Sequence, residues 1–408
     1  MANPLTIFNA SVQPQSLAWQ VAAATVSRVV INTARRFVYT FAPVLSRAMG
    51  LPLTAITSLI AINQAAGLLS PIFGSLSDRL GYRMMMLAGV SLLTIGMFLG
   101  GLFPFYGMIV ISLIMAGLCK SLFDPALHAY IGEQVPFAQR GRVIGIIEFG
   151  WAGSVLIGIP TVGILIDRWG WRAPFFVIGG LALLCLVAIR ILMPARSAIG
   201  PANRQPPLLK GWQLLRRNRA AVGALGFGLL LSLANDILFV IYGAWLEADF
   251  SLKVVALGMA TTVIGLAELL GEILTASIAD RLGPKRAIGS GIVLTAFSYA
   301  LLPLLAKQLP LALLGIFLIF LFFEFTVVTS LSLFTELLPQ ARATMMSVSV
   351  ATSSLGRMAG AAIGGLVWQV GGLTAVCMVA SIVTGLALVS LLWGLRHWQP
   401  SQQAANPQ

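Results

Sequence analysis

The stretch GSLSDRLGYR, residues 74–83, interrupts an apolar part of the chain with one acidic and two basic side chains. A second stretch, ASIADRLGPKR at residues 276–286, repeats its Asp-Arg-Leu-Gly core 202 residues later. Another pair of segments has nearly the same offset: EQVP at 133–136 and ELLP at 336–339, each followed by arginine. Two matched pairs at nearly one offset indicate a duplicated unit. Parallel repeats of this kind in membrane proteins place a central site between the copies.

The composition excludes an ordinary soluble domain. Of the 408 residues, 58% are hydrophobic and 10% are charged, whereas about 25% are charged in an average soluble domain. The mean hydropathy is +0.92. So few charges cannot cover a water-facing surface of this size. A bilayer accepts about 20 apolar residues per helix, so the chain is long enough for about a dozen membrane spans with short loops.

Apolar runs separated by glycine, proline or charge clusters predict twelve transmembrane helices. We expect an all-α integral membrane protein made of two pseudo-symmetric six-helix bundles, residues 1–193 and 219–408, joined by a cytoplasmic linker at 194–218. The end of the linker, residues 208–217, is predicted to form a short amphipathic helix on the membrane surface. The predicted spans are residues 21–46, 52–77, 84–103, 106–132, 142–166, 172–193, 219–246, 253–279, 286–306, 309–335, 343–369 and 372–396.

The basic residues predict the orientation of the chain. With a cytoplasmic N-terminus, 16 of the 26 basic residues lie in cytoplasmic segments, 5 in outer segments and 5 within spans. Positive charge collects on the cytoplasmic side of membrane proteins, so both termini are predicted in the cytoplasm and the multi-pass chain in a plasma or inner membrane. The net charge of +13 follows from this topology. No nucleic-acid partner is expected, because the basic residues do not gather on one folded face.

The loop at residues 74–83, with its weaker copy at 276–286, resembles the loop signature of the major facilitator superfamily. Twelve spans, a long central loop and a six-plus-six duplication are similar to the same family. The resemblance implies a secondary transporter of a small organic solute that works by rocker-switch alternating access. It also implies that this loop latches the cytoplasmic side in the outward-facing state. The residues that match the latch are Gly74, Asp78, Arg79, Gly81, Arg83, Asp280, Arg281, Gly283 and Arg286.

Two spans bear on the direction of transport. Residues 158–163, GIPTVG, match part of the Gly-Pro pattern that drug antiporters of the resembling family carry in the fifth helix. Residues 117–125, GLCKSLFDP, lack the Arg-then-Gln-Gly pattern common in the fourth helix of that group. The partial match and the apolar spans favour export, whereas the charged lining favours a specific polar metabolite.

Charged residues within the predicted spans carry the predicted chemistry, because a charge near the bilayer centre is costly. The first half holds four basic and two acidic residues, whereas the second holds four acidic residues and one basic residue. In the resembling family, helices 1, 4, 7 and 10 line the cavity, and each carries a charge here. A cavity lined by these two halves suits an anionic or zwitterionic ligand on the first half and a proton on the second. Alternatively, the charges of the two halves pair with each other and hold one conformational state closed. The residues are Arg28, Arg35, Arg36, Lys120, Asp124, Glu148, Asp236, Glu268, Glu272, Glu324 and Arg357.

One face of the first span is polar. Four of its residues follow spacings of four, three and four, which places them on one side of a helix. Arginine holds carboxylate or phosphate through two parallel hydrogen bonds, so Arg35 or Arg36 is a candidate clamp. Equally, both are candidate structural partners for an acid on helix 5, 7 or 10. The four residues of this face are Arg28, Asn32, Arg35 and Tyr39. The full set of predicted substrate-binding residues is Asn32, Arg35, Arg36, Tyr39, Lys120, Asp124, Asp236 and Glu324.

Two pairs of charged residues lie one helical turn apart. Lys120 and Asp124 have opposite charges and are expected to pair within their helix, either to ease membrane insertion or to hold a ligand. Glu268 and Glu272 have the same charge, so one of them is expected to keep its proton. This makes the second pair a candidate proton site, or alternatively a partner for basic residues.

Proton coupling requires a carboxyl group that water reaches from each side of the membrane in turn, with a pKa near the ambient pH. Asp236 and Glu324 lie in the middle of predicted cavity helices and are the first candidates for proton coupling, followed by Glu268. A permanent ion pair with the opposite wall is the structural alternative for each of them.

These features predict a proton-coupled secondary transporter of a small organic solute, with export slightly favoured, acting as a monomer in the lipid bilayer. A facilitated-diffusion uniporter of a polar metabolite is the alternative. A membrane receptor or enzyme is disfavoured, because the loops are short and hold no catalytic set. Neither a metal nor another cofactor is expected, since the two histidines and three cysteines do not have metal-ligand spacing.

Overall fold

The computed structural model describes residues 14–135, 137–194, 208–338 and 342–396. Within these ranges the chain is helical with short turns, and no β-strand occurs. The predicted all-α class is therefore confirmed. Most of the predicted linker lies outside the described residues.

By their contacts the helices form two compact units, each described by itself. The first unit holds residues 1–37 and 72–200, and the second holds residues 38–71 and 201–408. The units differ from the predicted bundles in the placement of residues 38–71. The boundary and pseudo-symmetry of two six-helix bundles stay a prediction.

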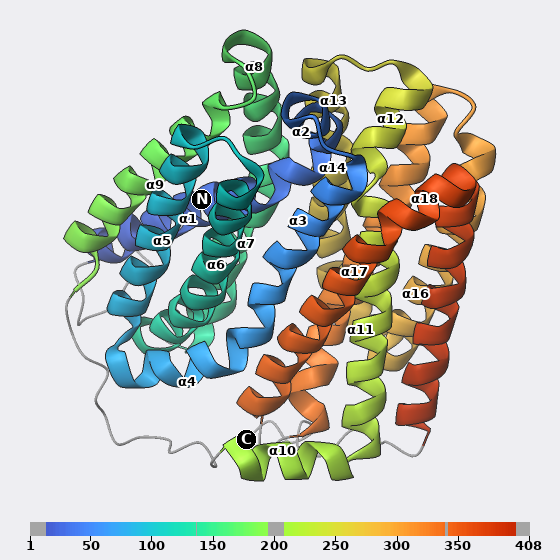
Figure 1. The fold of residues 1–408 in the computed structure, drawn as a ribbon. Coiled ribbons are helices and arrows are strands. Elements are labelled where there is room, and N and C mark those ends of the chain that lie inside the picture. The colour runs from blue at the N-terminus through green and yellow to red at the C-terminus, as the bar shows by residue number, and fades with distance from the viewer. Residues whose placement is uncertain (1–13, 136, 195–207, 339–341, 397–408) are drawn as a thin grey trace, which may run out of the picture. The chain divides into compact units, whose positions relative to one another are not determined.

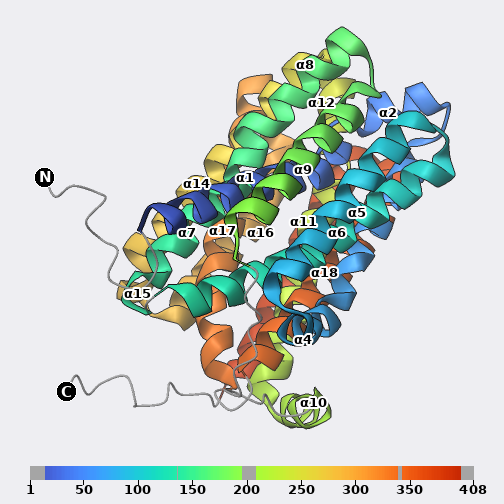
Figure 2. The same cartoon turned by 90° about the vertical axis from the view of Figure 1, so that its left-hand side faces the viewer.

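The first unit contains three long helices that run side by side, namely α5, α6 and α9 (Figures 1 and 2). Arg172, just before α9, donates from Nε and Nη2 to the carbonyl oxygen of Gly101 at 2.9 and 2.5 Å and so ties α9 to the end of α5. The elements are most of α1 (Pro14–Thr40), α4 (Ser70–Leu80), α5 (Tyr82–Leu102), α6 (Tyr106–Gln134), α7 (Phe137–Gly153), the π-helical segment η2 (Ser154–Gly158), α8 (Ile159–Trp169) and α9 (Ala173–Leu192).

In the second unit α11 packs along α18, and α10 lies across the start of α11 (Figure 1). The predicted surface helix at 208–217 is confirmed as a helix with the same bounds. The elements are α2 (Ala42–Met49), α3 (Leu53–Ala65), η1 (Ala66–Leu69), α10 (Leu208–Arg217), α11 (Arg219–Phe239), α12 (Tyr242–Phe250), α13 (Val254–Ala260), α14 (Thr262–Leu274), η3 (Thr275–Ala279), α15 (Asp280–Leu282), α16 (Pro284–Leu305), α17 (Leu309–Leu337) and α18 (Arg342–Leu395).

Ten helical stretches of the described residues are long and apolar enough to cross a membrane. The last of them, Thr344–Leu395, has 52 residues and contains a non-helical step, with φ of −144° at Gly371 and 58° at Gly372. It therefore covers two of the predicted ranges, and the ten stretches account for eleven of the twelve. The remaining range, 21–46, falls on α1 and α2. The 27 residues of α1 include three arginines, which set it apart from the apolar stretches.

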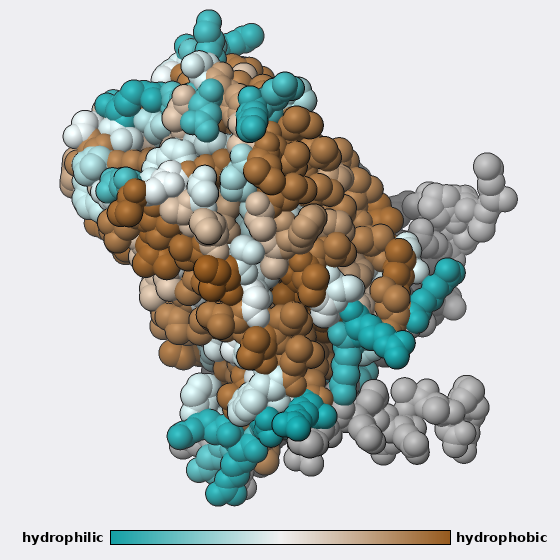
Figure 3. All heavy atoms as spheres, turned by 90° about the vertical axis from the view of Figure 1, so that its right-hand side faces the viewer, coloured by the Kyte–Doolittle hydropathy of each residue, from teal (hydrophilic) through white to brown (hydrophobic). Residues whose placement is uncertain are grey.

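The surface supports a membrane environment. Large apolar side chains point outward, and Ile191 and Val370 are 74% and 91% exposed. On the face in Figure 3, hydrophobic side chains form a wide band and hydrophilic side chains gather at its two ends. Contact of such a band with lipid tails costs no free energy, whereas its exposure to water is unfavourable.

The repeated loop has the same backbone conformation in both copies. Gly81 precedes α5 with φ 90° and ψ 139°, and Gly283 precedes α16 with φ 76° and ψ 147°. A positive φ favours glycine because it has no Cβ. The two Asp-Arg-Leu-Gly segments therefore turn into the next helix in the same way, which supports the predicted duplication.

The first predicted span is broken near its end. α1 ends at Thr40, Phe41 forms a turn, and α2 begins at Ala42. Pro43 is the physical reason, because it has no N–H to donate and its ring would clash with the carbonyl group of Tyr39 in a continuous helix.

Small residues let α1 approach α7 and α8 in the first unit. A Cβ placed on Gly150 would lie 2.6 Å from the Cβ of Arg28 and 3.0 Å from the carbonyl oxygen of Thr25. On Gly158, at the end of η2, it would overlap the side chain of Thr33. This close approach lets side chains of α7 reach the polar face of α1.

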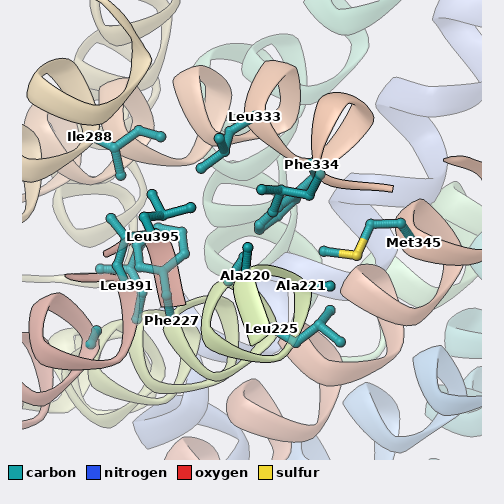
Figure 4. Packing of buried hydrophobic residues seen from close by; sticks show 14 of the residues in the cluster. Ala220, Ala221, Leu225, Phe227, Ile288, Leu333, Phe334, Met345, Leu391 and Leu395 are labelled. Atoms are coloured by element: carbon teal, nitrogen blue, oxygen red, sulfur yellow. The ribbon is translucent and has the colours of Figure 1, made fainter. Parts of the chain in front are cut away.

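The second unit has an apolar core shared by α11, α16, α17 and α18. Figure 4 shows Phe227 of α11 and Phe334 of α17 among these side chains. Close packing of α11 on α18 depends on glycine: a Cβ on Gly360 would lie 2.5 Å from the carbonyl oxygen of Leu233 and 3.0 Å from the Cβ of Asp236. Gly356 and Gly364, one turn to each side, meet α11 in the same way.

Replacing Gly360 with alanine is expected to destabilise the protein by about 1–3 kcal/mol, because the added methyl group forces α18 away from α11. The measurement is thermal unfolding of the purified protein in detergent. Gly385→Ala, also in α18, is the matched control, since no atom lies within 4 Å of its added Cβ. Equal unfolding temperatures for the two variants would contradict the packing argument.

Candidate functional site

Arg28 is the centre of a charged cluster in the first unit. Its Nη1 and Nη2 donate to the two carboxylate oxygens of Glu148 at 2.5 and 3.0 Å, and its Nε lies 3.7 Å from Asp124 Oδ1. The Arg28 side chain is 5% exposed. The cluster joins α1, α6 and α7, and a bidentate pair of this kind fixes orientation as well as charge.

Lys120 extends the cluster along α6. Its Nζ lies 2.7 Å from Asp124 Oδ2, so the predicted pair within the helix is present. The same ammonium group donates to Asn32 Oδ1 of α1 at 3.0 Å. Of the predicted substrate-binding residues of α6, Lys120 therefore contacts Asn32 of α1, whereas Asp124 contacts Lys120 and Arg28. His128, one turn further along α6, lies 3.8 Å from Glu148.

Trp151 is a site residue that sequence reasoning missed. The guanidinium group of Arg36 lies 4.1 Å from the centre of its ring, and Lys120 Nζ lies 5.0 Å from it. Both distances are in the range of cation–π attraction. The available signal was its position three residues after Glu148, on the same face of the same helix.

The second unit holds a buried network around Asp236. This residue is 0% exposed, accepts a hydrogen bond from Tyr39 at 3.0 Å and lies 4.0 Å from Arg357 Nη1. Gln64 of α3 donates to the same Tyr39 hydroxyl at 2.5 Å. Predicted site residues Tyr39 and Asp236 are thus in contact, whereas Gln64 was not predicted.

Hydroxyl and aromatic side chains surround this network. Tyr242 hydrogen-bonds to Thr40 and, at 2.8 Å, to Thr261. The ring of Phe239 stacks on Tyr242 at a centroid distance of 5.3 Å and lies 4.5 Å from Tyr39. These contacts join residues 39–40 to α11, α12 and the α13–α14 turn within the second unit.

The helices α14 and α17, which carry the acidic residues Glu268, Glu272 and Glu324, pack on each other. A Cβ on Gly271 would lie 2.9 Å from the Cβ of Glu324, so the two helices are in close contact there. Glu268 lies three positions before Gly271, on the same side of α14, and Glu272 follows Gly271 directly in the sequence. Glu268 is 2% exposed. The packing therefore places Glu324 of α17 against Gly271 of α14, the helix that also carries Glu268 and Glu272.

The predicted substrate-binding residues divide between the units. The first unit holds Asn32, Arg35, Arg36, Lys120 and Asp124, and the second holds Tyr39, Asp236 and Glu324. Within the described residues, no group of three potential metal ligands occurs.

The predicted latch is described in part. Arg83 donates to the carbonyl oxygen of Arg190 at 2.5 Å, which ties the start of α5 to the end of α9. Arg281 and Arg286 are exposed. Gly74 lies in α4, and the side chains of Asp78, Arg79 and Asp280 lie outside the described part of the structure.

Comparisons with known proteins agree with this architecture. The profile of the Major Facilitator Superfamily matches residues 24–240 and 225–408. The chain is 29% identical over 318 residues to YceJ, an MFS-type transporter of Bacillus subtilis (strain 168), covering 76% of this chain and 81% of that protein. It is 26% identical over 256 residues to the multidrug resistance protein MdtG of Escherichia coli (strain K12 / DH10B), covering 60% of each. The match thus spans less than two thirds of MdtG.

Two solved structures have a similar fold. A mutant form of the nucleoside transporter NupG superposes with a TM-score of 0.76 at 14% identity, covering 93% of this chain and all of that one. A bacterial homologue of the human lysosomal transporter Spinster, inward-facing and occupied, gives 0.76 at 13% identity, with coverage of 96% and 100%. At these identities the likeness concerns the fold alone.

Proposed function

Because the chain belongs to the Major Facilitator Superfamily, whose members are multi-pass membrane transporters of small molecules, we propose that it is a proton-coupled secondary transporter that exports a small organic solute. The similarity to MdtG, a multidrug resistance protein, supports export. We place the chain in the plasma or inner membrane with both termini in the cytoplasm, on the strength of its basic loops. It is proposed to act as a monomer, without catalytic chemistry.

The observation that carries proton coupling is the close packing of α14, which bears Glu268 and Glu272, against Glu324 of α17. Negative charges on neighbouring turns inside a membrane disfavour each other, which suits these acids to carrying a proton. We propose that one of them takes up and releases the transported proton. The hydroxyl group of Thr275, directly after α14, donates to the carbonyl oxygen of Phe325 in α17 at 3.4 Å, so the end of α14 also lies close to α17.

Glu324 is the preferred proton carrier. Asp236, ranked equally from the sequence, is fully buried between Tyr39 and Arg357. A carboxylate held by a hydroxyl donor and a guanidinium group stays charged, which supports the alternative of a permanent ion pair. We assign Asp236 to holding residues 38–71 against α11 and α18, and Glu268 to the second rank among proton carriers.

The repeated loop is proposed as the conformational latch. The matching backbone turns at Gly81 and Gly283 support equivalent roles for the two copies. Arg83, bound to the end of α9, anchors the first copy. Asp78 and Asp280 are the proposed movable partners at the ends of their helices.

The test of this function is proton movement driven by solute. The full chain is placed in proteoliposomes that contain a pH-sensitive dye, and nucleosides, organic anions and organic cations are added one by one. We expect at least one solute to change the internal pH only in vesicles that contain the protein. A solute flux that is the same with and without an imposed pH gradient would overturn proton coupling and support the uniporter alternative.

A further inference from the structure

We infer that the first unit binds a small organic anion, whose carboxylate or phosphate-type headgroup is held by Asn32, Arg36, Lys120 and Trp151. This inference rests on the proposed transport function and names the class of solute. The four side chains come from α1, α6 and α7, which meet around the Lys120 ammonium group. Lys120 lies 3.0 Å from Asn32 and 5.0 Å from the Trp151 ring, and Arg36 lies 4.1 Å from that ring.

Two buried donors in this cluster lack a hydrogen-bond partner among the described residues: Asn32 Nδ2 and Trp151 Nε1. Asn32 is 1% exposed. Its orientation follows from Lys120, which has only donors and so must face the amide oxygen, leaving the NH₂ end for another group. Buried polar groups nearly always have a partner, so two unpaired donors indicate a ligand that accepts hydrogen bonds.

The charges select an anion among such ligands. Within the spans of the first unit, the acids Asp124 and Glu148 face four cations, and both acids contact Arg28 or Lys120. A cationic ligand would meet repulsion here, whereas an oxyanion gains charge-assisted hydrogen bonds. The four cations are Arg28, Arg35, Arg36 and Lys120.

The cluster is also reachable. The side chains of Lys120 and Asp124 retain 19% and 20% of their exposure, and Trp151 is half-buried. Asp124 competes with a ligand for Lys120, and its second partner Arg28 allows it to shift without losing its charge pairing. An entering headgroup therefore replaces one contact of Lys120 and adds contacts to Asn32 and Trp151.

The test measures binding without transport. The purified full chain in neutral detergent is titrated with benzoate and phenylphosphonate, and with benzamide as the uncharged analogue, with thermal unfolding as the readout. We expect both anions to stabilise the protein and benzamide to bind at least about tenfold more weakly. Equal stabilisation by benzamide would overturn the inference.

Variants identify the site. Trp151→Phe keeps an aromatic ring and removes the N–H, and Lys120→Gln removes the charge; each is expected to weaken anion binding by about tenfold. Trp393→Phe is the matched control, because that ring also lies 4.6 Å from a guanidinium group, that of Arg219, but in the second unit. The unfolding temperature without ligand separates misfolding from lost binding. Anion affinity that is unchanged in both variants overturns the assignment.

A lipid headgroup has the same chemistry, so the titration is repeated in nanodiscs. If benzoate binds equally in phosphatidylcholine and phosphatidylglycerol discs, the site takes a soluble anion as inferred. If phosphatidylglycerol abolishes benzoate binding, the site belongs to a lipid and the solute assignment is wrong. A transporter of neutral or cationic solutes would fail this binding test and still pass the proton-flux test.

Discussion

Replacing Arg28 with methionine should lower the free energy of unfolding by roughly 3 kcal/mol, since removing one partner of a buried ion pair leaves the other charge uncompensated. Arg28 is 5% exposed and makes both hydrogen bonds to Glu148. The estimate stays at the low end because the Glu148 side chain retains 34% exposure. The measurement is thermal unfolding of the purified protein in detergent.

The same substitution at an exposed pair is the control. Arg47 lies 2.7 Å from Glu247 and is 61% exposed, so Arg47→Met should change stability by less than about 1 kcal/mol. The double variant Arg28→Met with Glu148→Gln should regain part of the loss, because it removes both charges of the pair. If Arg28→Met unfolds at the temperature of Arg47→Met, the cluster contributes little to the fold.

Glu324→Gln should abolish solute accumulation driven by a pH gradient while leaving exchange of solute for solute intact. Glutamine keeps the size and polarity of the side chain but cannot take up or release a proton, so solute movement is no longer coupled to proton movement. The measurement is uptake of the solute identified by the proton-flux screen, into proteoliposomes with and without an imposed gradient.

Glu336→Gln is the control for this change, because Glu336 lies at the end of the same helix and is exposed. Glu268→Gln should weaken coupling, and Asp236→Asn should lower stability more than coupling. If Glu324→Gln, Glu268→Gln and Asp236→Asn all respond to the pH gradient like the wild type, these acids are not the proton carriers.

Local patterns were sufficient to predict most of the helices. Hydropathy runs and glycine or proline breaks predicted eleven ranges that fall on the ten apolar helical stretches, and the bounds of α10 were the same in sequence and structure. The pair of Lys120 and Asp124 was predictable because spacing of four residues fixes neighbours on one helix. Such features depend on residues close in sequence.

Contacts between distant helices were not predictable in the same way. Arg28 donates two hydrogen bonds to Glu148, 120 residues away, and Gly150 lets α7 approach α1 closely enough for this contact. Trp151 and Gln64 carry no charge, so their residue type alone did not distinguish them from packing residues; only the spacing of Trp151 from Glu148 was a signal. Likewise, Pro43 ends α1 through local chemistry, but the packing of residues 38–71 with α11 and α18 follows from tertiary contacts.

The π-helical segment η2 has a consequence for register. A π-helical turn holds more residues than an α-helical turn, so α7 and α8 belong to one rod but are out of phase. The face that carries Glu148 and Trp151 does not continue past Gly158 at the spacing of a regular helix. In a relative whose fifth helix is α-helical throughout, the equivalent of α8 would therefore align only after a one-residue gap within residues 154–158. Without that gap, every residue of α8 would be aligned one position away from its structural equivalent in the relative, and lipid-facing residues would be compared with buried ones.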